Sequence, residues 1–429
     1  MGEEPAFHVL KPRNTLAFTG AVCLVMGLLL GHAALLTLAT VTLVALVLGA
    51  WQSIGLLGGV TVRRVHPPRA FQENSVGVTL RLENTDRRAP ELVLVEDRFP
   101  PSSANRIRRL LHTPLRRGRV AEVNFIGSCD HRRGPYVLGP ARVEAQDALG
   151  LFTREVTVEE FTNLLVYPQA VALEAHEVLG EGTLAHVGLE TTPRAGVSEE
   201  FSGLREYHQG DSPRLIHWKS TARHGEIMIK EFQEERTTLV SILLDIGRQG
   251  LVGVGDQTSV EYAIRAAATI ARHAEQLGHF LQFFSIGDHV EHVPEGNGTA
   301  HLLTILDRLA VLRPAGPSAF SVVAGDLTPH LAPGSTAVMI QGATTVELEA
   351  VDSLTAHLLS RAIMPVFVLV DDRSFIKLFR DQEDRHAEAL ALEEIVQHLQ
   401  LMGARVHVLR RGGNIGRELR TGLDMGAPR

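Results

Sequence analysis

One block of the sequence combines residue types that could do chemistry. Residues 200–223 hold Tyr207, Asp211, Arg214, His217 and Trp218, although the whole chain has only four Tyr and two Trp. Arginine and histidine beside an acidic residue suit recognition of an anion or a shared hydrogen-bond network. The block could therefore be a partner-binding or switching site, or a polar network that holds two domains together.

The block is expected to contain a short helix. Asp211 or Ser212 can cap its N-terminus, Pro213 suits the first helical position, and Gly225 can end it. Helical spacing would place Trp218 on an apolar face with Leu215 and Ala222, and His217 beside that face with Arg214 and Thr221. The candidate residues for a partner-binding or interdomain network are Arg205, Tyr207, Asp211, Arg214, His217, Trp218 and Arg223.

A catalytic interpretation of the same block is the alternative. Asp211, Arg214 and His217 could form the site of an enzyme if they converge in an open cleft. No nucleophile motif accompanies them, so the sequence indicates no particular reaction. Burial of all three in satisfied pairs would instead favour the structural network.

Composition sets the class of protein. The 429 residues are 45% hydrophobic and 21% charged, which is typical of globular domains. A formal net charge of -7 gives no reason to expect nucleic acid as a ligand. The two cysteines imply neither a disulfide framework nor a zinc site, and no Gly-rich nucleotide motif has the required spacing. No cofactor is expected.

The N-terminal region is predicted to cross a membrane twice. No Asp, Glu, Lys or Arg occurs between Arg13 and Arg63, and this stretch fits two spans, Leu16–Leu30 and Ala33–Trp51, with a turn at Gly31. Lys11 and Arg13 precede the first span, and Arg63, Arg64 and Arg69 follow the second, so both ends are expected in the cytoplasm. A cleaved signal peptide or a buried soluble hairpin are the alternatives.

The rest of the chain is predicted to form a β-rich part followed by an α/β part. Ser75–Asn84 alternates apolar and polar residues, as a half-buried strand does, and short strands at close spacing predict a small sandwich. Six arginines in this part could contact anionic lipid or an acidic partner, or could be solvated surface. They are Arg106, Arg108, Arg109, Arg116, Arg117 and Arg119.

Alternating strands and helices follow from residue 237. A buried strand over 238–244 ends in Asp245, and a helix over 259–277 is expected to begin at the capping pair Thr258 and Glu261 and to stop at Gly278. Further strands are expected at Phe280–Ile286, Thr336–Ile340, Pro365–Val370 and Arg405–Leu409, with helices at Ala300–Leu312 and Ala387–Leu401. This order predicts an open parallel sheet covered by helices on both faces.

Several motifs together resemble one family. The run Arg205–Asp211, the run Arg214–Trp218 and Ala222-Arg223 are similar to the signature of the bacterial and archaeal domain of unknown function 58 family, DUF-58. Gly134–Pro140, Asp147–Phe152 and Val166–Pro168 are similar to that family as well. The resemblance implies an inner-membrane protein with a von Willebrand factor A-like C-terminal domain. It also implies work beside a MoxR-type AAA+ ATPase and other von Willebrand A-like or transglutaminase-like membrane proteins.

The resemblance also indicates where a metal site would lie in the C-terminal domain. Von Willebrand A domains often bind a divalent cation through Asp-x-Ser-x-Ser after the first strand. Here Asp245 is followed by Gly247 and Gln249 at the two serine positions, so the site is degenerate and no metal is expected. Asp371 and Asp372 end another strand, where they could be a ligand pair or, more simply, turn residues.

These interpretations give the predicted domain plan. It runs as an N-terminal arm and transmembrane hairpin (1–58), a β-sandwich (59–168), a connecting segment with the signature block (169–236) and a von Willebrand factor A-like α/β domain (237–429). The expected function is a membrane-anchored, cytoplasm-facing scaffold or adaptor that binds protein partners.

Overall fold

The computed structural model divides into two compact units, Met1–Pro168 and Gln169–Arg429. It describes residues 12–90, 92–111, 114–171, 173, 199–207, 213, 216–234, 238–255, 257–317, 319–376 and 382–420. Each unit is described by itself.

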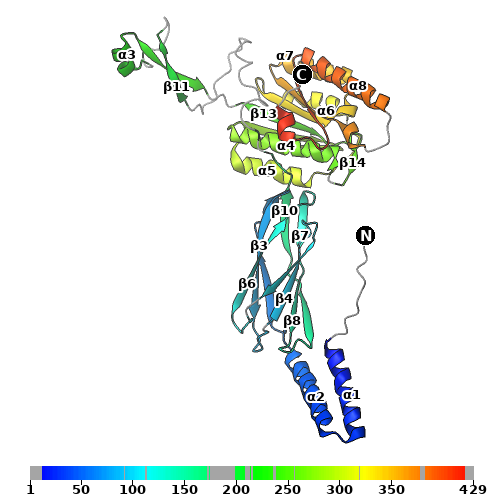
Figure 1. Ribbon diagram of the computed structural model, residues 1–429. Helices are drawn as coiled ribbons and strands as arrows, with labels where there is room; N and C mark the ends of the chain where they lie inside the picture. The colour runs from blue at the N-terminus through cyan, green and yellow to red at the C-terminus, as the bar shows by residue number, and fades with distance from the viewer. Residues whose placement is uncertain are drawn as a thin grey trace. The chain divides into compact units, whose positions relative to one another are not determined.

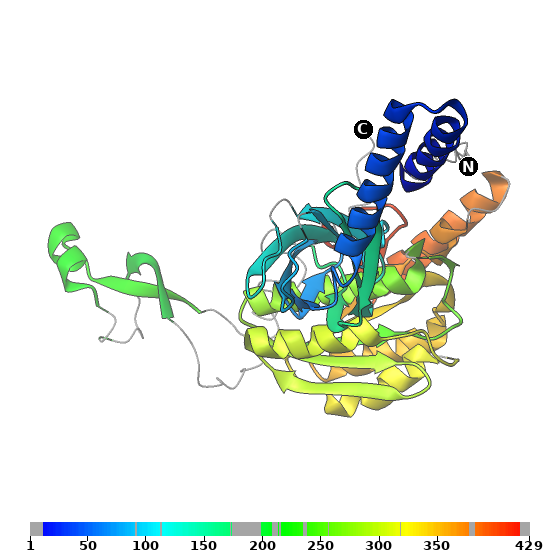
Figure 2. The same cartoon turned by 90° about the horizontal axis from the view of Figure 1, so that it is seen from below.

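The first unit begins with two apolar helices that lie side by side, α1 (Pro12–Leu30) and α2 (Ala33–Ser53), as Figures 1 and 2 show. Gly20 and Gly27 allow the close approach, because a Cβ at Gly20 would lie 2.5 Å from Thr42 Oγ1. Both helices are long and apolar enough to cross a membrane, and Gly31 turns the chain between them with a positive φ. The predicted span boundaries and turn agree with these helices. Most large aliphatic side chains of the pair are exposed, which disfavours the buried soluble hairpin.

Ten strands follow among the described residues of the first unit. The alternation predicted for Ser75–Asn84 is confirmed, because every second side chain from Val76 to Leu82 is buried. One hydrophobic core takes residues from facing sheets, as a sandwich requires. The sheets are β1-β3-β6, β5-β4-β8-β9 and β2-β10-β7, all antiparallel except the β2–β10 pair. The strands are β1 (Val60–Val65), β2 (Arg69–Phe71), β3 (Ser75–Asn84), β4 (Leu92–Arg98), β5 (Arg106–Leu111), β6 (Val120–Ser128), β7 (Gly134–Leu138), β8 (Ala141–Gln146), β9 (Thr153–Val158) and β10 (Thr162–Tyr167).

A fully buried ion pair ties these sheets together. Arg64 of β1 holds Asp97 of β4 with two bonds, Nη2 to Oδ1 at 2.5 Å and Nε to Oδ2 at 3.0 Å, and neither side chain is exposed. The same guanidinium donates to the carbonyls of Leu138 and Glu160 and to Thr162 Oγ1. Arg64 therefore belongs to the interior of the β domain and is not a free flanking charge of the second helix.

Loss of one partner of this pair should be costly, because it leaves a buried charge without a counter-ion. We expect Asp97→Ala to lower the free energy of unfolding of the β domain by about 3–5 kcal/mol. Arg81→Ala, which breaks the exposed Arg81–Glu122 pair, should cost less than about 1 kcal/mol. Denaturant unfolding of the detergent-solubilised chain measures both, and equal losses would contradict the assignment.

The second unit contains the predicted open sheet. Its strand order is β17-β16-β13-β18-β19-β20, parallel throughout except for the edge strand β17. Helix α4 packs on one face with α5 beside it, and α6, α7 and α8 contribute to the core on the other face (Figure 1). The predicted helix-covered parallel sheet is confirmed. Its strands are β13 (Leu239–Asp245), β16 (Phe280–Ile286), β17 (Val290–Gly296), β18 (Thr336–Gly342), β19 (Met364–Val370) and β20 (Arg405–Leu409).

Helix α4 of this unit begins and ends as its capping residues predict. Thr258 Oγ1 accepts from the N–H of Glu261 at 3.3 Å to open α4, and Gly278 follows it with a positive φ. The helices are α4 (Ser259–Gln276), α5 (Gly298–Val311), α6 (Phe320–Leu327), α7 (Leu348–Ser360), α8 (Gln382–Leu401) and α9 (Ile415–Arg420). Short elements complete the unit: β14 (Gly253–Val254), β15 (Gln257–Thr258), η3 (Thr328–His330), η4 (Ala343–Thr345) and η5 (Asp372–Phe375).

Before the sheet, the signature block forms an antiparallel hairpin that the sequence patterns did not predict. Strand β11 (Glu199–Glu206) pairs with β12 (Met228–Glu234), with a bulge between Phe201 and Gly203. Helix α3 (Trp218–His224) lies at the end of this hairpin (Figure 1).

Candidate functional site

The helix in the signature block starts later than its sequence predicts. The predicted helix does not run unbroken from Pro213 to Gly225, because α3 begins at Trp218 with His217 as its N-cap. The proposed caps Asp211 and Ser212 lie outside the described residues. Ile216 makes a β-bridge to Ile229 of β12, so the chain pairs with the hairpin directly before the cap. The predicted end is confirmed, since Gly225 follows α3 with a φ of 79°.

His217 fastens α3 to the hairpin through several bonds. Its Nδ1 lies 2.8 Å from Ser220 Oγ and accepts the N–H of Ser220 at 3.3 Å. Its backbone N–H donates to the carbonyl of Met228 at 2.8 Å. Thr221 Oγ1 then accepts the N–H of Met228 at 3.0 Å. The described contacts of His217 thus give it a structural role within the hairpin.

The cap can be tested by exchange of the helix amides. His217→Ala removes the side-chain acceptor, and such losses cost about 0.5–2 kcal/mol, so the amide of Ser220 should exchange faster. His217→Asn is the matched control, because asparagine is among the best N-cap residues. Hydrogen exchange read by mass spectrometry compares the three proteins. Equal protection of α3 in all of them would contradict the capping role.

An exposed aromatic surface lies beside this cap. Tyr207 follows β11 and donates its N–H to the carbonyl of Ile227 at 2.9 Å, so these residues are neighbours across the hairpin, one step from the Met228 that binds His217. Trp218 is 69% exposed, Tyr207 40% and Ile227 44%. We call these three residues the aromatic end of the hairpin. Trp218 and Ala222 lie four residues apart on α3, so they share a face as predicted, and both are exposed; Leu215 lies outside the described residues.

The other predicted residues of the block are only partly described. Arg205 pairs with Ile229 in the hairpin, and its side chain is outside the described part. Arg223 is exposed on α3. Asp211 and Arg214 lie outside the described residues, so an enzyme site formed by them with His217 stays a prediction.

The carboxyl edge of the parallel sheet gathers a second group of polar residues. Asp245 ends β13, and its Oδ1 accepts the N–H of Gly247 at 2.8 Å, which closes the turn that leads to Gln249. Asp372 follows β19, and its Oδ2 accepts from both the N–H and Oγ1 of Thr344, at 3.2 Å and 2.7 Å. Among the residues described here, no three His, Cys, Asp or Glu form a group that could hold a metal.

The sequence patterns indicated Asp372 most simply as a turn residue and did not predict its burial. The pKa of Asp372 is raised to about 6, mainly by burial; the bonds from Thr344 lower it, and the carboxylates of Asp371 and Asp245 add to the rise. Its Oδ1 has no hydrogen-bond partner. The signal in the sequence was the position directly after a buried parallel strand, where this edge commonly binds ligands.

The raised pKa makes stability depend on pH with a defined sign. Below the ordinary value of 3.8 the folded and unfolded chains are both protonated, and stability then falls as pH rises through about 6. Asp372→Asn should therefore raise the free energy of unfolding at pH 8 by about 1–3 kcal/mol and change it little at pH 4. Asp371→Asn is the control. Denaturant titrations at the two pH values measure this, and an equal effect at both would contradict it.

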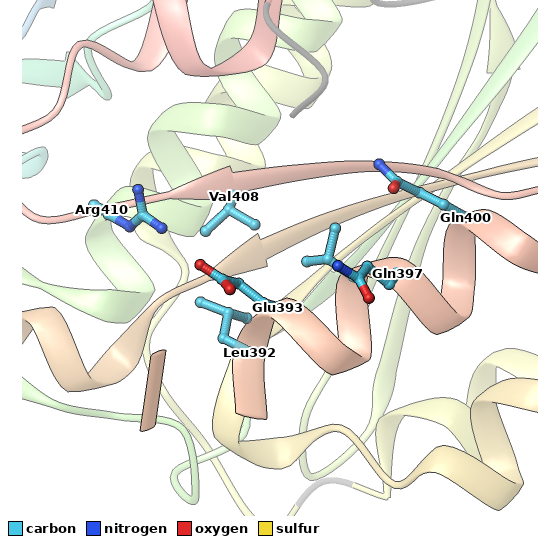
Figure 3. Close-up of a pocket in the computed structure, with 7 residues that line it drawn as sticks. Leu392, Glu393, Gln397, Gln400, Val408 and Arg410 are labelled. Atoms are coloured by element: carbon cyan, nitrogen blue, oxygen red, sulfur yellow. The ribbon is translucent and has the colours of Figure 1, made fainter. Parts of the chain in front are cut away.

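A pocket beside this edge has no predicted site residue in its lining. A small pocket of about 30 Å³ lies between α8 and β20, lined by Leu392, Glu393, Val396, Gln397, Gln400, Val408 and Arg410 (Figure 3). Arg410 also lies 3.7 Å from Asp371 Oδ2, so one end of the pocket adjoins the carboxyl edge. Its lining is mainly aliphatic and amide, with Glu393 and Arg410 as the charged residues.

Comparison with known proteins finds a match to one family model over part of the chain. Residues 203–357 match the family described as "Protein of unknown function DUF58", a range that holds α3, the end of the hairpin and the first half of the sheet. The uncharacterized protein YeaD of Bacillus subtilis (strain 168) is 25% identical over 181 residues, which are 42% of this chain and 43% of YeaD. The chain thus matches less than half the length of this relative.

Two solved structures each resemble about a quarter of the chain. The CARDB domain of a Pyrococcus furiosus protein, crystallised with di-metal ions, covers 25% of this chain and 86% of its own length, with 11% identity and a TM-score of 0.18. The PKD domain of an M14-like peptidase from a Thermoplasmatales archaeon covers 23% and 91%, with 16% identity and a TM-score of 0.16. Scores this low carry no inference about fold or function.

Proposed function

We propose that this protein is a membrane-anchored, cytoplasm-facing adaptor and that the aromatic end of its hairpin binds a protein partner. The observation that carries the proposal is the exposure of Trp218 beside Tyr207 and Ile227. Exposed tryptophan and tyrosine are costly to leave in water and are enriched among the residues that dominate binding energies. The cap at His217 presents Trp218 on a short, fixed helix.

The anchor in this proposal is the pair α1 and α2. Their length, their apolar composition and their exposed aliphatic surface support insertion in a bilayer. The basic residues Arg13 and Arg63 at the two ends of the pair support a cytoplasmic location for the rest of the chain. By the family resemblance, the membrane would be the bacterial inner membrane.

The partner class in this proposal is a MoxR-type AAA+ ATPase. It rests on the resemblance of the signature block to the DUF-58 family, as does the von Willebrand A-like assignment of the sheet. The open parallel sheet with helices on both faces supports that assignment. Its degenerate first-strand motif at Asp245, Gly247 and Gln249 favours protein binding without a bridging cation.

Capture from the native host tests the proposal. Tagged full-length protein is extracted in mild detergent at native expression level, and bound proteins are identified by mass spectrometry. Trp218→Ala should lower recovery of the ATPase by about tenfold or more. Leu401→Ala, which removes an exposed apolar side chain from α8, is the matched control and should recover it fully.

Two results would contradict the proposal in different ways. Equal recovery of the ATPase by the parent and both variants would show that the aromatic end is not the contact. If chemical cross-linking precedes extraction and the parent still captures no AAA+ ATPase, the proposed class of partner is contradicted.

A further inference from the structure

We propose that the end of the β domain next to α2 binds the headgroups of anionic phospholipids. This surface is formed by the exposed residues Arg87, Arg116, Arg117 and Arg119, which we call the basic end. The inference rests on the membrane anchor of the proposed function and adds a lipid class to it.

Backbone contacts place these arginines beside the second helix. The segment after α2 meets the loop after β3, since the carbonyl of Gly59 accepts the N–H of Thr85 at 2.9 Å. The loop before β6 joins the same place, because Gly118 donates its N–H to Asn84 at 2.8 Å and Asn84 Nδ2 donates to the carbonyl of Leu115 at 2.9 Å. Loops that are distant in sequence therefore converge where α2 ends.

Side chains at this end also contact the helices directly. Arg88 Nη1 donates to the carbonyl of Trp51 at 3.2 Å, and its guanidinium lies 5.5 Å from the centre of the Trp51 ring. A Cβ at Gly49 would lie 3.1 Å from the ring of Phe152, and the Arg13 guanidinium lies 5.6 Å from the centre of that ring. The loop that carries Phe152 thus touches both helices near the predicted membrane boundary.

The positive charge of the basic end is not neutralised within the described part of the chain. Arg87, Arg116, Arg117 and Arg119 form no ion pair with a described carboxylate. The described carboxylates in the adjoining loops serve the backbone instead. Asp86 Oδ1 accepts the N–H of Arg87 at 2.6 Å, and Asp147 accepts the N–H of Phe152 at 2.6 Å.

Arginines elsewhere in the same domain behave differently. Arg106 and Arg108 both pair with Glu96, at 3.3 Å and 2.5 Å, and the bonds from Arg108 lower the pKa of Glu96. Of the six arginines grouped in the sequence, Arg106 and Arg108 therefore pair with Glu96 on the sheet, whereas Arg116, Arg117 and Arg119 lie in the loop before β6 without a described carboxylate partner.

Apolar side chains at the basic end fit a bilayer interface. Trp51 is 63% exposed at the end of α2, and Leu149 is 56% exposed in the loop that also carries Phe152. Tryptophan gathers at the headgroup level of membranes, and clustered arginines next to a membrane helix bind anionic lipid. A lipid headgroup fits this combination better than an acidic protein, because the bilayer would lie directly beside it.

Full-length protein in nanodiscs tests the inference by hydrogen exchange. Discs of phosphatidylcholine alone are compared with discs that contain phosphatidylglycerol. We expect amides of residues 85–90 and 114–119 to exchange more slowly in the anionic discs, and 0.5 M NaCl to remove the difference. Arg116→Gln with Arg117→Gln should cancel most of it, since each arginine near an anionic surface changes the affinity by about fivefold.

The control variant removes the same charge elsewhere on the domain. Arg98→Gln with Arg109→Gln, on β4 and β5, should keep the difference between the two kinds of disc. Equal exchange of the parent in both kinds of disc would overturn the inference. Equal slowing by inorganic phosphate in phosphatidylcholine discs would also overturn it, in favour of a free anion. Failure of the chain to enter discs would overturn the membrane anchor and the lipid site together. A failed ATPase capture would contradict only the proposed partner.

Discussion

The apolar surface of α1 and α2 is the constraint on which the first unit depends. These helices pack on each other through Gly20 and Gly27, yet they leave their leucine and valine side chains uncovered. Such a surface must be removed from water, and a bilayer is the cover that we propose. The contacts of Trp51 and Phe152 then join the β domain to the helix pair where polar surroundings must begin. The free arginines gather at that same end.

Buried polarity plays opposite roles in the two units. In the β domain, Arg64 and Asp97 satisfy each other, and carbonyls from two further segments use the remaining donors, so the pair specifies how the sheets meet. In the α/β domain, Asp372 is buried near the carboxylates of Asp371 and Asp245, and burial is the main cause of its raised pKa. The first arrangement stabilises the fold, whereas the second costs stability at neutral pH and marks the edge of the sheet where a partner or ligand could compensate.

The hairpin explains why one sequence block can look both structural and functional. The hydrogen bonds of His217 and Thr221 cap α3 and join it to β12, which is a structural role. That arrangement leaves Trp218 in solvent, as a binding element would. The polar residues of the block therefore position the helix. The aromatic residues form the surface that we propose for the partner.

The sequence by itself determined the elements whose signals are local. Apolar length defined α1 and α2, alternation defined β3, and the cap at Thr258 with Gly278 defined α4, because each depends on neighbours in the chain. The tertiary structure decided the rest. The bridge of Ile216 to Ile229 moved the start of α3, the pairing of Arg64 with Asp97 turned an apparent flanking charge into core, and the raised pKa of Asp372 arose from burial. Each of these depends on residues far apart in sequence, whose distances no local pattern encodes.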